Sequence, residues 1–156
     1  MLQESTIEIP KTRGEILRDK VQIRLALDVY GKDIEKILAE NDVFLPGADF
    51  SKVFPHWIIA MVEDEVIGCL QVMPAKPIGW LEMLAVKPSV SFKLRAIAMR
   101  KLMQQGIATL YLGGSQLAFA TVGTSNKKMK SVLEKINFSK VFDAEIMVKS
   151  LIKETS

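Results

Sequence analysis

The chain has 156 residues, of which 49% are hydrophobic and 25% charged, a balance that suits one compact domain and excludes a disordered or fibrous chain. Its apolar runs fall well short of the roughly 20 residues that span a bilayer, and residues 1–20 mix charges without an apolar signal segment. One cysteine and one histidine are too few for an internal disulfide or a zinc site. We therefore expect a cytoplasmic protein with no metal centre and no membrane attachment.

The net charge of +3 is unevenly distributed along the chain. No acidic residue occurs between Glu82 and Glu134. The basic residues of this stretch are Lys87, Lys93, Arg95, Arg100, Lys101, Lys127, Lys128 and Lys130. They predict either a positive region suited to a phosphate-bearing ligand or a solvated basic face balanced by the acidic N-terminal half. A nucleic acid is not expected as partner, because aromatic residues do not interleave with the cations as they do in single-strand binders.

The first predicted element is a strand over 21–27, where apolar and polar residues alternate. Residues 1–20 are therefore expected to be an N-terminal extension, and residues 21–156 the globular domain. Asp28 is expected to cap a helix in which apolar residues recur at helical spacing up to Asn41.

Three short apolar runs follow, at 57–62, 66–73 and 80–86. Their lengths and the turns between them predict an antiparallel meander of strands that are buried on both faces. Pro88 is expected to end the third strand.

A long helix is predicted to begin near residues 89–90. It could end near Gln105, with 107–112 as a strand, or continue to Gly113. We favour the longer helix, because the next apolar run then forms a strand directly before the next helix.

The C-terminal part is predicted to contain a strand over 117–122 and an amphipathic helix over 126–136. The apolar face of this helix includes Leu133. Residues 138–142 and 144–151 are expected to close the chain as a hairpin.

The predicted order of elements is β-α-β-β-β-α-β-α-β-β, and on this order four short motifs resemble the GNAT superfamily of acetyltransferases. The motifs are Ile23-Arg24-Leu25-Ala26, Val66-Ile67-Gly68, Met83-Leu84-Ala85-Val86-Lys87-Pro88, and Asn126 followed by Leu133-Glu134-Lys135-Ile136-Asn137-Phe138. The resemblance covers residues 21–151. It implies the α/β (α+β) acyl-CoA N-acyltransferase fold, a single domain with a mixed central sheet of about six to seven strands flanked by helices.

The resemblance also implies a site for acetyl-CoA, or another acyl-CoA, in the gap where the fourth and fifth strands separate. The pantetheine would pair with the backbone of Leu84, Ala85 and Val86. The phosphates would meet the start of the next helix, where amides are unpaired and the helix dipole is positive. The residues implied there are Ser91, Phe92, Lys93, Leu94, Arg95 and Ala96, and Asn126 is the remaining residue implied in cofactor binding.

This phosphate loop departs from the family pattern, in which Arg or Gln, then Gly, then Gly or Ala occur at fixed spacing. Only Ala96 fits, since Ser91 replaces the Arg or Gln and Leu94 replaces the first Gly. Leu94 could obstruct the phosphate, or displace it toward the neighbouring basic side chains. Alternatively, Phe92 and Leu94 could pack as core.

A second departure is Leu133, which stands where many family members carry a Tyr that protonates the departing CoA thiolate. Leu cannot donate a proton, although a thiol that titrates at about 8.5 can leave as the thiolate and be protonated by water. Two functions remain open: acetyl transfer from acetyl-CoA to an amine by direct attack, or a catalytically degenerate module that binds CoA or another protein. The sequence does not identify the amine acceptor, and it leaves a homodimer open.

Glu82 is the candidate catalytic base, because it is the only charge within the run at 80–86 and a buried carboxylate needs a partner. It would take a proton from the acceptor amine, directly or through water. The alternative is a structural carboxylate that pairs with a lysine or lies exposed at the end of the sheet. His56 is expected as a surface or structural histidine, although near the acceptor cleft it could serve as a base, and Cys69 is expected as a small core residue.

Overall fold

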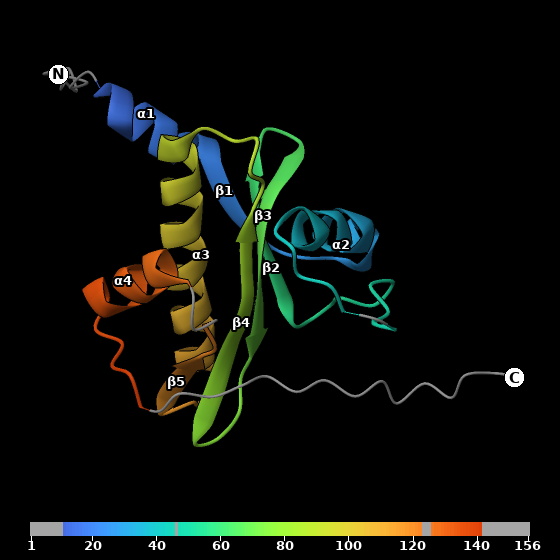
Figure 1. Cartoon of the computed structure of the whole chain (residues 1–156), viewed down its shortest axis with the longest axis vertical. Helices are drawn as coiled ribbons and strands as arrows, with labels where there is room; N and C mark the ends of the chain where they lie inside the picture. The colour runs from blue at the N-terminus through green and yellow to red at the C-terminus, as the bar shows by residue number, and fades with distance from the viewer. Residues whose placement is uncertain (1–10, 46, 123–125, 142–156) are drawn as a thin grey trace, which may run out of the picture.

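The computed structural model describes residues 11–45, 47–122 and 126–141, which form a five-stranded sheet with helices against both faces (Figure 1). The strands are β1 (Val21–Leu25), β2 (Trp57–Val62), β3 (Glu65–Met73), β4 (Ile78–Val86) and β5 (Leu117–Ala120). The helices are α1 (Arg13–Lys20), the 3₁₀ turn η1 (Asp28–Tyr30), α2 (Gly31–Glu40), α3 (Phe92–Leu112) and α4 (Lys127–Lys135). The predicted α/β class is confirmed.

The strands lie in the sheet in the same order as in the chain. The first four are antiparallel to their neighbours, which confirms the predicted meander, whereas β5 pairs with β4 in parallel. A parallel pair needs a crossover connection, and α3 provides it by running from the end of β4 back to the start of β5. The sheet is therefore mixed.

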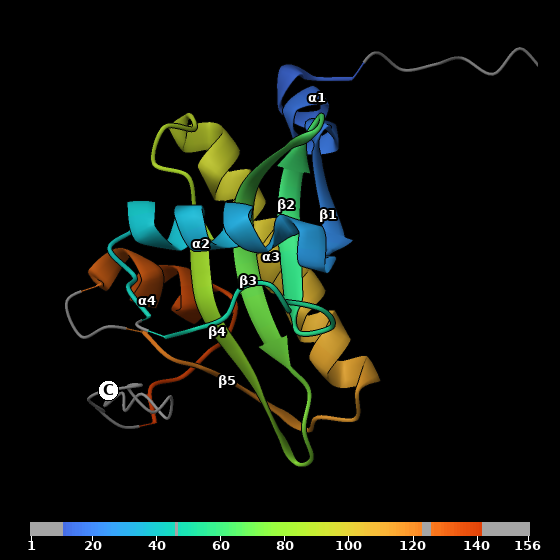
Figure 2. The ribbon, with the colours of Figure 1, turned by 90° about the vertical axis from the view of Figure 1, so that its right-hand side faces the viewer.

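Side chains that alternate along the strands divide the core into two layers. In one layer α3 packs on the sheet with Leu102 and Leu110 buried, and α4 lies on the same side. In the other layer α2 buries Ile34, Ile37 and Leu38, which share one face of the helix. Figure 2 shows α2 crossing in front of the sheet, with α3 behind it. We refer to these two sides as the α2 face and the α3 face.

The described residues hold five strands, fewer than the six to seven that the family resemblance implies. Residues 138–141, the described part of the strand predicted over 138–142, form no strand. Instead, Asn137 has a left-handed φ of 67° and the amide of Phe138 donates to the carbonyl of Leu133, a C-cap that closes α4. The strand predicted over 144–151 lies outside the described residues.

The expectation that Asp28 caps the second helix is wrong. The helix α2 begins at Gly31, after η1, and has no side-chain cap. The carboxylate of Asp28 instead accepts from the amides of Val53 and Phe54, each over 2.9 Å. The carbonyl of Phe50 lies so close to Gly31 that a Cβ would meet it at 1.6 Å. The segment before β2 therefore packs against the start of α2, where a cap and a side chain would otherwise lie.

The longer version of the central helix is confirmed, since α3 runs without interruption from Phe92 to Leu112. Gly106 lies inside it, and a Cβ there would meet Leu70 at 2.8 Å and Leu81 at 2.9 Å. The glycine therefore allows the helix to approach the sheet closely. Within the described part of the chain, no helix is long and apolar enough to cross a membrane.

The helix α1 was not predicted, although its start carries a sequence signal. Thr12 and Glu15 form a capping box, in which each side chain accepts from the other residue's amide. None of the residues of α1 is buried, so no apolar pattern marks it. Its end is held by Lys101 of α3, whose ammonium donates to the carbonyls of Arg18 and Val21.

Candidate functional site

The parallel ladder between β4 and β5 is short. It joins Ile78–Leu81 to residues 117–120, and β5 ends there. β4 continues from Glu82 to Val86 with no described strand beside it on this side. We call this opening the β4–β5 fork. A strand that lacks a neighbour leaves amides and carbonyls unpaired, so the fork offers main-chain hydrogen bonds to a ligand.

A β-bulge lies at the mouth of the fork. The register of β3 and β4 shifts between Cys69 and Gln71, where β4 has one residue more than β3. There Met83 has a φ of 55°, which a non-glycine residue adopts only where the surrounding structure holds it. Leu81 packs on the α3 face, whereas Met83 packs on the α2 face. The bulge therefore places both Glu82 and Met83 on the α2 face.

Glu82 occupies the first position of the fork. The hydroxyl of Thr121, the residue after β5, donates to its Oε1 over 3.4 Å. The side chain is half-buried, and within the described residues it forms no ion pair. Glu82 is therefore neither paired with a lysine among the described residues nor fully exposed. A half-buried carboxylate with one long hydrogen bond keeps the capacity to accept a proton or further donors.

The three residues expected to bind pantetheine all lie on the unpaired part of β4. Leu84 is half-buried, and Ala85 and Val86 are buried, so the strand presents mainly its backbone. The amide of Lys87 donates to the carbonyl of Ile67. In an antiparallel ladder the preceding residue, Val86, then turns its amide and carbonyl away from β3, toward the fork.

Asn41, the residue directly after α2, is a functional candidate that was not predicted from the sequence. Its side-chain amide donates to the carbonyl of Ile37 over 2.8 Å and to that of Val86 over 3.1 Å. The first bond is a helix C-cap, which an Asn after an amphipathic helix indicates. The second bond depends on how α2 packs across the sheet, and no local sequence pattern predicts it.

The start of α3 lies directly after the fork. Its N-cap is Ser91, whose hydroxyl accepts from the amide of Leu94 and whose carbonyl accepts from the amide of Arg95. The helix therefore begins two residues later than predicted, at Phe92. The amides of Phe92 and Lys93 have no acceptor within the described residues. Two unpaired amides at a positive helix end suit an anion.

The alternative that Phe92 and Leu94 both pack as core is half correct. Leu94 is half-buried and packs against the core layer on the α3 face. Phe92 is 80% exposed, and Ala96, one turn further along, is exposed as well. The expected phosphate loop is therefore anchored by Leu94, keeps Arg95 half-buried, and presents its other four side chains to solvent.

Arg95 carries a polar atom that the described residues leave unpaired. Its Nε is buried and has no hydrogen-bond partner within the described residues. A buried N–H without an acceptor is costly, so such atoms call for a missing acceptor. The amides of Phe92 and Lys93 are the donors at this helix start that the described residues leave open to an anion.

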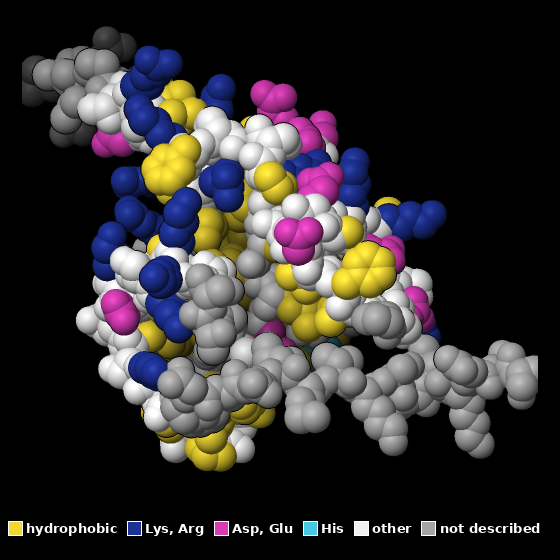
Figure 3. All heavy atoms as spheres, in the orientation of Figure 1, with side chains coloured by type: hydrophobic (Ala, Val, Ile, Leu, Met, Phe, Trp, Pro, Cys, Tyr) yellow, Lys and Arg dark blue, Asp and Glu magenta, His cyan; other side chains and the backbone are white. Residues whose placement is uncertain are grey.

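The basic residues gather on one side of the fork. In Figure 3 lysine and arginine side chains cluster over α3 and α4, acidic side chains lie mainly on the opposite side, and hydrophobic side chains line the hollow between them. Lys101 belongs to this set but is engaged with α1. The distribution favours a polyanion approaching from the α3 and α4 side.

Two residues at the C-terminal helix make contacts within the fold. Asn126 is the N-cap of α4, with its Oδ1 accepting from the amide of Met129 over 3.0 Å. Leu133 is 7% exposed and belongs to the core layer on the α3 face. Its position is therefore structural, as its place on the apolar stripe indicates.

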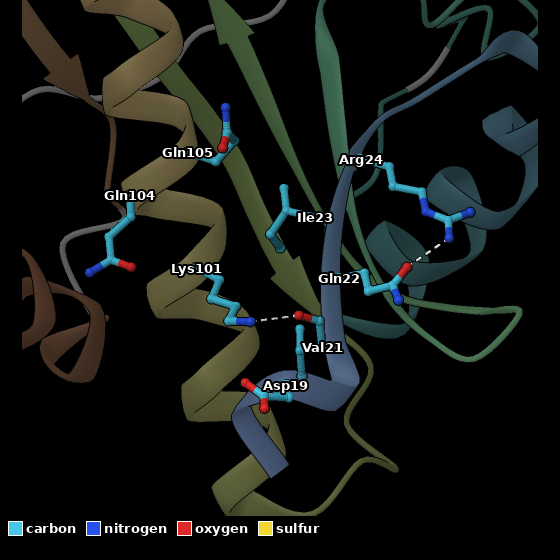
Figure 4. Close-up of a pocket in the computed structure, with 8 residues that line it drawn as sticks. All are labelled: Asp19, Val21, Gln22, Ile23, Arg24, Lys101, Gln104 and Gln105. Carbon is cyan, nitrogen blue, oxygen red and sulfur yellow. Dashed lines mark hydrogen bonds between the residues drawn. The ribbon is translucent and has the colours of Figure 1, made fainter. Parts of the chain in front are cut away.

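A second hollow lies at the far edge of the sheet, between β1 and α3 (Figure 4). This shallow groove of about 750 Å³ is polar, with Lys101 donating to the carbonyl of Val21 and Arg24 donating to the side chain of Gln22. It contains none of the residues predicted for the site. β2, β3 and β4 separate it from the fork, so we place the site at the fork and not in this groove.

The remaining candidate nucleophile and base stay outside the site. Cys69 is fully buried, and burial raises the pKa of its thiol to about 12, so it remains protonated at neutral pH. The core role predicted for it is confirmed. His56 is exposed at the start of β2, as predicted. In the described residues no group of three metal-binding side chains lies together.

Comparison with known proteins identifies the fold. No protein-family model and no curated protein matches the sequence. Solved structures do match, among them a transcriptional regulator from Bacillus halodurans C-125, with a TM-score of 0.68 and 14% identity over 83% of this chain and 99% of that one. An aminoglycoside N-acetyltransferase in complex with CoA matches with a TM-score of 0.64 and 14% identity, over 83% of this chain and 94% of that one.

An aminoglycoside acetyltransferase from an uncultured soil metagenomic sample, in complex with sisomicin, also matches. Its TM-score is 0.64 and its identity 12%, over 87% of this chain and 99% of that one. Likeness at such low identity concerns the fold. The chain therefore has the acyl-CoA N-acyltransferase fold of the GNAT acetyltransferases.

Proposed function

We propose that the chain is a divergent member of the GNAT superfamily that transfers an acyl group from acetyl-CoA, or a related acyl-CoA, to an amine. The observation that carries this proposal is the β4–β5 fork, where unpaired β4 backbone leads from Glu82 to the anion-suited start of α3. Among the structural neighbours, one is a complex with CoA and another is a complex with the aminoglycoside sisomicin. These complexes support an acyl-CoA as donor and an amine as acceptor.

The cosubstrate would be held by two parts of the chain. The backbone of Leu84 and Val86 would bind the pantetheine at the fork. The amides of Phe92 and Lys93 and the guanidinium of Arg95 would bind the phosphates. Leu94 does not prevent this arrangement in our proposal, because its side chain packs toward the core.

The reaction needs one proton acceptor. The amine nitrogen attacks the thioester carbonyl carbon, so that a C–N bond forms, the C–S bond breaks and the CoA thiolate leaves. Glu82, half-buried at the mouth of the fork, would take the proton that the nitrogen releases, directly or through one water. Leu133 offers no proton to the thiolate, which water would protonate instead.

The alternative function is a catalytically degenerate domain that binds CoA or a protein partner without acyl transfer. The observation in its favour is the burial of Leu133, which leaves no acid at the position that carries Tyr in many family members. Acyl transfer and a CoA-binding degenerate domain both require that CoA binds at the fork, and they differ in turnover, whereas a protein-interaction domain does not require CoA.

Titration calorimetry with CoA, acetyl-CoA and a short DNA duplex tests the proposal first. We expect both CoA compounds to bind and the duplex not to bind at the same salt concentration. Absence of CoA binding at low salt would refute acyl transfer and leave the protein-interaction domain, and binding of the duplex would favour a nucleic-acid surface. Release of CoA thiol from acetyl-CoA in the presence of amines then separates transfer from binding alone.

A further inference from the structure

We propose that the acceptor is a primary amine attached to a flat apolar group, an arylalkylamine, and that Trp80 binds this group. The inference rests on the proposed function and names its substrate class. It comes from two neighbouring cross-strand contacts: Trp80 with Phe119 in the β4–β5 ladder, and Glu82 with Thr121 just beyond its end.

Both pairs lie on the α2 face. Leu81, between Trp80 and Glu82, packs on the α3 face, so its two neighbours point to the opposite face. On β5, Ala118 and Ala120 pack on the α3 face, which places Phe119 between them on the α2 face. An aromatic pair therefore sits one step along the same surface from the carboxylate at the fork.

The indole of Trp80 is held in place and left accessible. Its ring centroid lies 5.2 Å from that of Phe119 with an interplanar angle of 68°, an edge-to-face contact. Trp80 is 37% exposed, whereas Trp57, the other tryptophan, is 6% exposed. Figure 2 shows that α2 crosses the sheet over one part of β4 only, and that β4 runs on beyond it. A fixed, accessible aromatic surface beside a reactive site suits an apolar ligand group.

The carboxylate beside it lacks a cation. Glu82 is half-buried and has no ion-pair partner among the described residues, so it suits an ammonium group supplied by the ligand. Positions 80 and 82 are about 7 Å apart along a strand. A ring placed on Trp80 therefore brings an amine on a short alkyl chain next to Glu82.

The same geometry argues against other amines. A linear polyamine would satisfy the carboxylate but leave the exposed face of Trp80 without an apolar partner. In an arylalkylamine the ring and the ammonium are both used, and the nitrogen lies where Glu82 takes its proton as it attacks the thioester carbonyl.

The test compares phenethylamine, butylamine and spermidine as acceptors, by release of CoA thiol from acetyl-CoA. In the unmodified chain we expect kcat/KM for phenethylamine to exceed that for butylamine by about tenfold, as an aromatic contact is commonly worth. In Trp80→Leu the ratio of kcat/KM for phenethylamine to kcat/KM for butylamine should fall close to one because the value for phenethylamine falls. The kcat/KM for butylamine and the affinity for CoA should stay unchanged. Trp80→Phe, which keeps a ring, should retain part of the preference, and Tyr111→Leu, an exposed aromatic at the end of α3, should retain all of it.

Fluorescence titration without CoA gives a second, independent result. Phenethylamine should change the emission of the unmodified chain saturably, and Trp80→Leu, checked for folding by its melting curve, should not respond. Equal use of the three amines, a preference for spermidine, or a ratio kept in Trp80→Leu would overturn the aromatic acceptor while acyl transfer stands. Conversely, a fluorescence response without CoA binding would overturn the transferase and leave the aromatic amine site. If neither the fluorescence response nor CoA binding were observed, the transferase and the aromatic amine site would both be overturned.

Discussion

The side-chain amide of Asn41 donates to the carbonyl oxygen of Val86 over 3.1 Å, and so joins the end of α2 to the end of the strand expected to hold pantetheine. The same amide donates to the carbonyl of Ile37, which fixes its orientation. A carbonyl oxygen has two lone pairs, so Val86 can accept from Asn41 and from a ligand amide together.

We predict that Asn41→Ala weakens CoA binding by roughly three- to tenfold, because Val86 then loses the donor that fixes its carbonyl and one hydrogen bond is worth about 0.5–1.5 kcal/mol. Calorimetry measures the affinity, and a denaturant curve measures the accompanying loss of stability. Thr12→Ala, which removes the cap of α1 far from the fork, is the matched control: it should lower stability and leave CoA binding unchanged. Equal CoA affinity in Asn41→Ala and the unmodified chain would show that the bond is only structural.

Arg95 and Arg100 allow a paired test of the phosphate site. Arg95→Met should weaken CoA binding by roughly tenfold or more, because a hydrogen bond to a charged group is worth about 1.5–3 kcal/mol. Arg100→Met makes the same charge change at an exposed position on the same helix and should have a smaller effect. Binding by the unmodified chain should also weaken as salt rises, and equal losses in the two variants would indicate a diffuse basic surface in place of a phosphate site.

Leu94 tests whether the missing glycine of the phosphate loop limits binding. Its side chain packs against the core, so Leu94→Gly should remove apolar contacts and add the helix penalty of glycine, about 1 kcal/mol. We expect a clear loss of stability in denaturant and no gain in CoA affinity. A folded variant that binds CoA more tightly would show instead that Leu94 obstructs the phosphate.

The sequence predicted those parts of the fold that depend on local patterns. The meander, the long α3 and the amphipathic α2 and α4 follow from apolar periodicity, which burial in two layers imposes directly. Asp28 was misassigned because its partners, Val53 and Phe54, are distant in sequence and only tertiary packing brings them to it. The link from Asn41 to Val86 was missed for the same reason.

The site was predictable in outline and not in detail. The resemblance of the fourth-strand motif indicated the segment around Val86, and the fork indeed lies there. The exposure of Phe92 and the orphaned Nε of Arg95 depend on how the first turn of α3 is rotated against the sheet, which a degenerate loop motif does not specify.

Alanine substitutions at two helical glycines, Gly106 and Gly14, distinguish the effect of close packing on stability from the effect of helix propensity. Gly106→Ala should destabilise the fold by about 1–3 kcal/mol, because the new Cβ would lie 2.8 Å from Leu70 and 2.9 Å from Leu81. Gly14→Ala, in α1, meets only Thr12 at 4.0 Å and should stabilise by about 0.5–1 kcal/mol. Denaturant unfolding measures both changes, and a stabilised Gly106→Ala variant would contradict the close approach of α3 to the sheet.

Glu82→Gln tests the proposed base directly. Gln has nearly the same shape and can accept from the hydroxyl of Thr121, but it cannot take a proton at neutral pH. We expect kcat to fall by about 10²–10⁴-fold with an acceptor amine, while the affinity for CoA stays within the experimental error. The deficit should shrink as the pH approaches about 10, where an alkylamine loses its proton to water without help.

Glu65→Gln is the matched control for this substitution. Glu65 is an exposed carboxylate at the start of β3 that pairs with Lys87, and its replacement should leave kcat unchanged. If Glu82→Gln kept full activity at neutral pH, the carboxylate would not be the base, and water or a residue outside the described part of the chain would have to accept the proton. Both substitutions remove one negative charge, but only Glu82 lies at the fork. Equal losses of activity in the two variants would therefore show that the charge of the protein matters and not the position of Glu82.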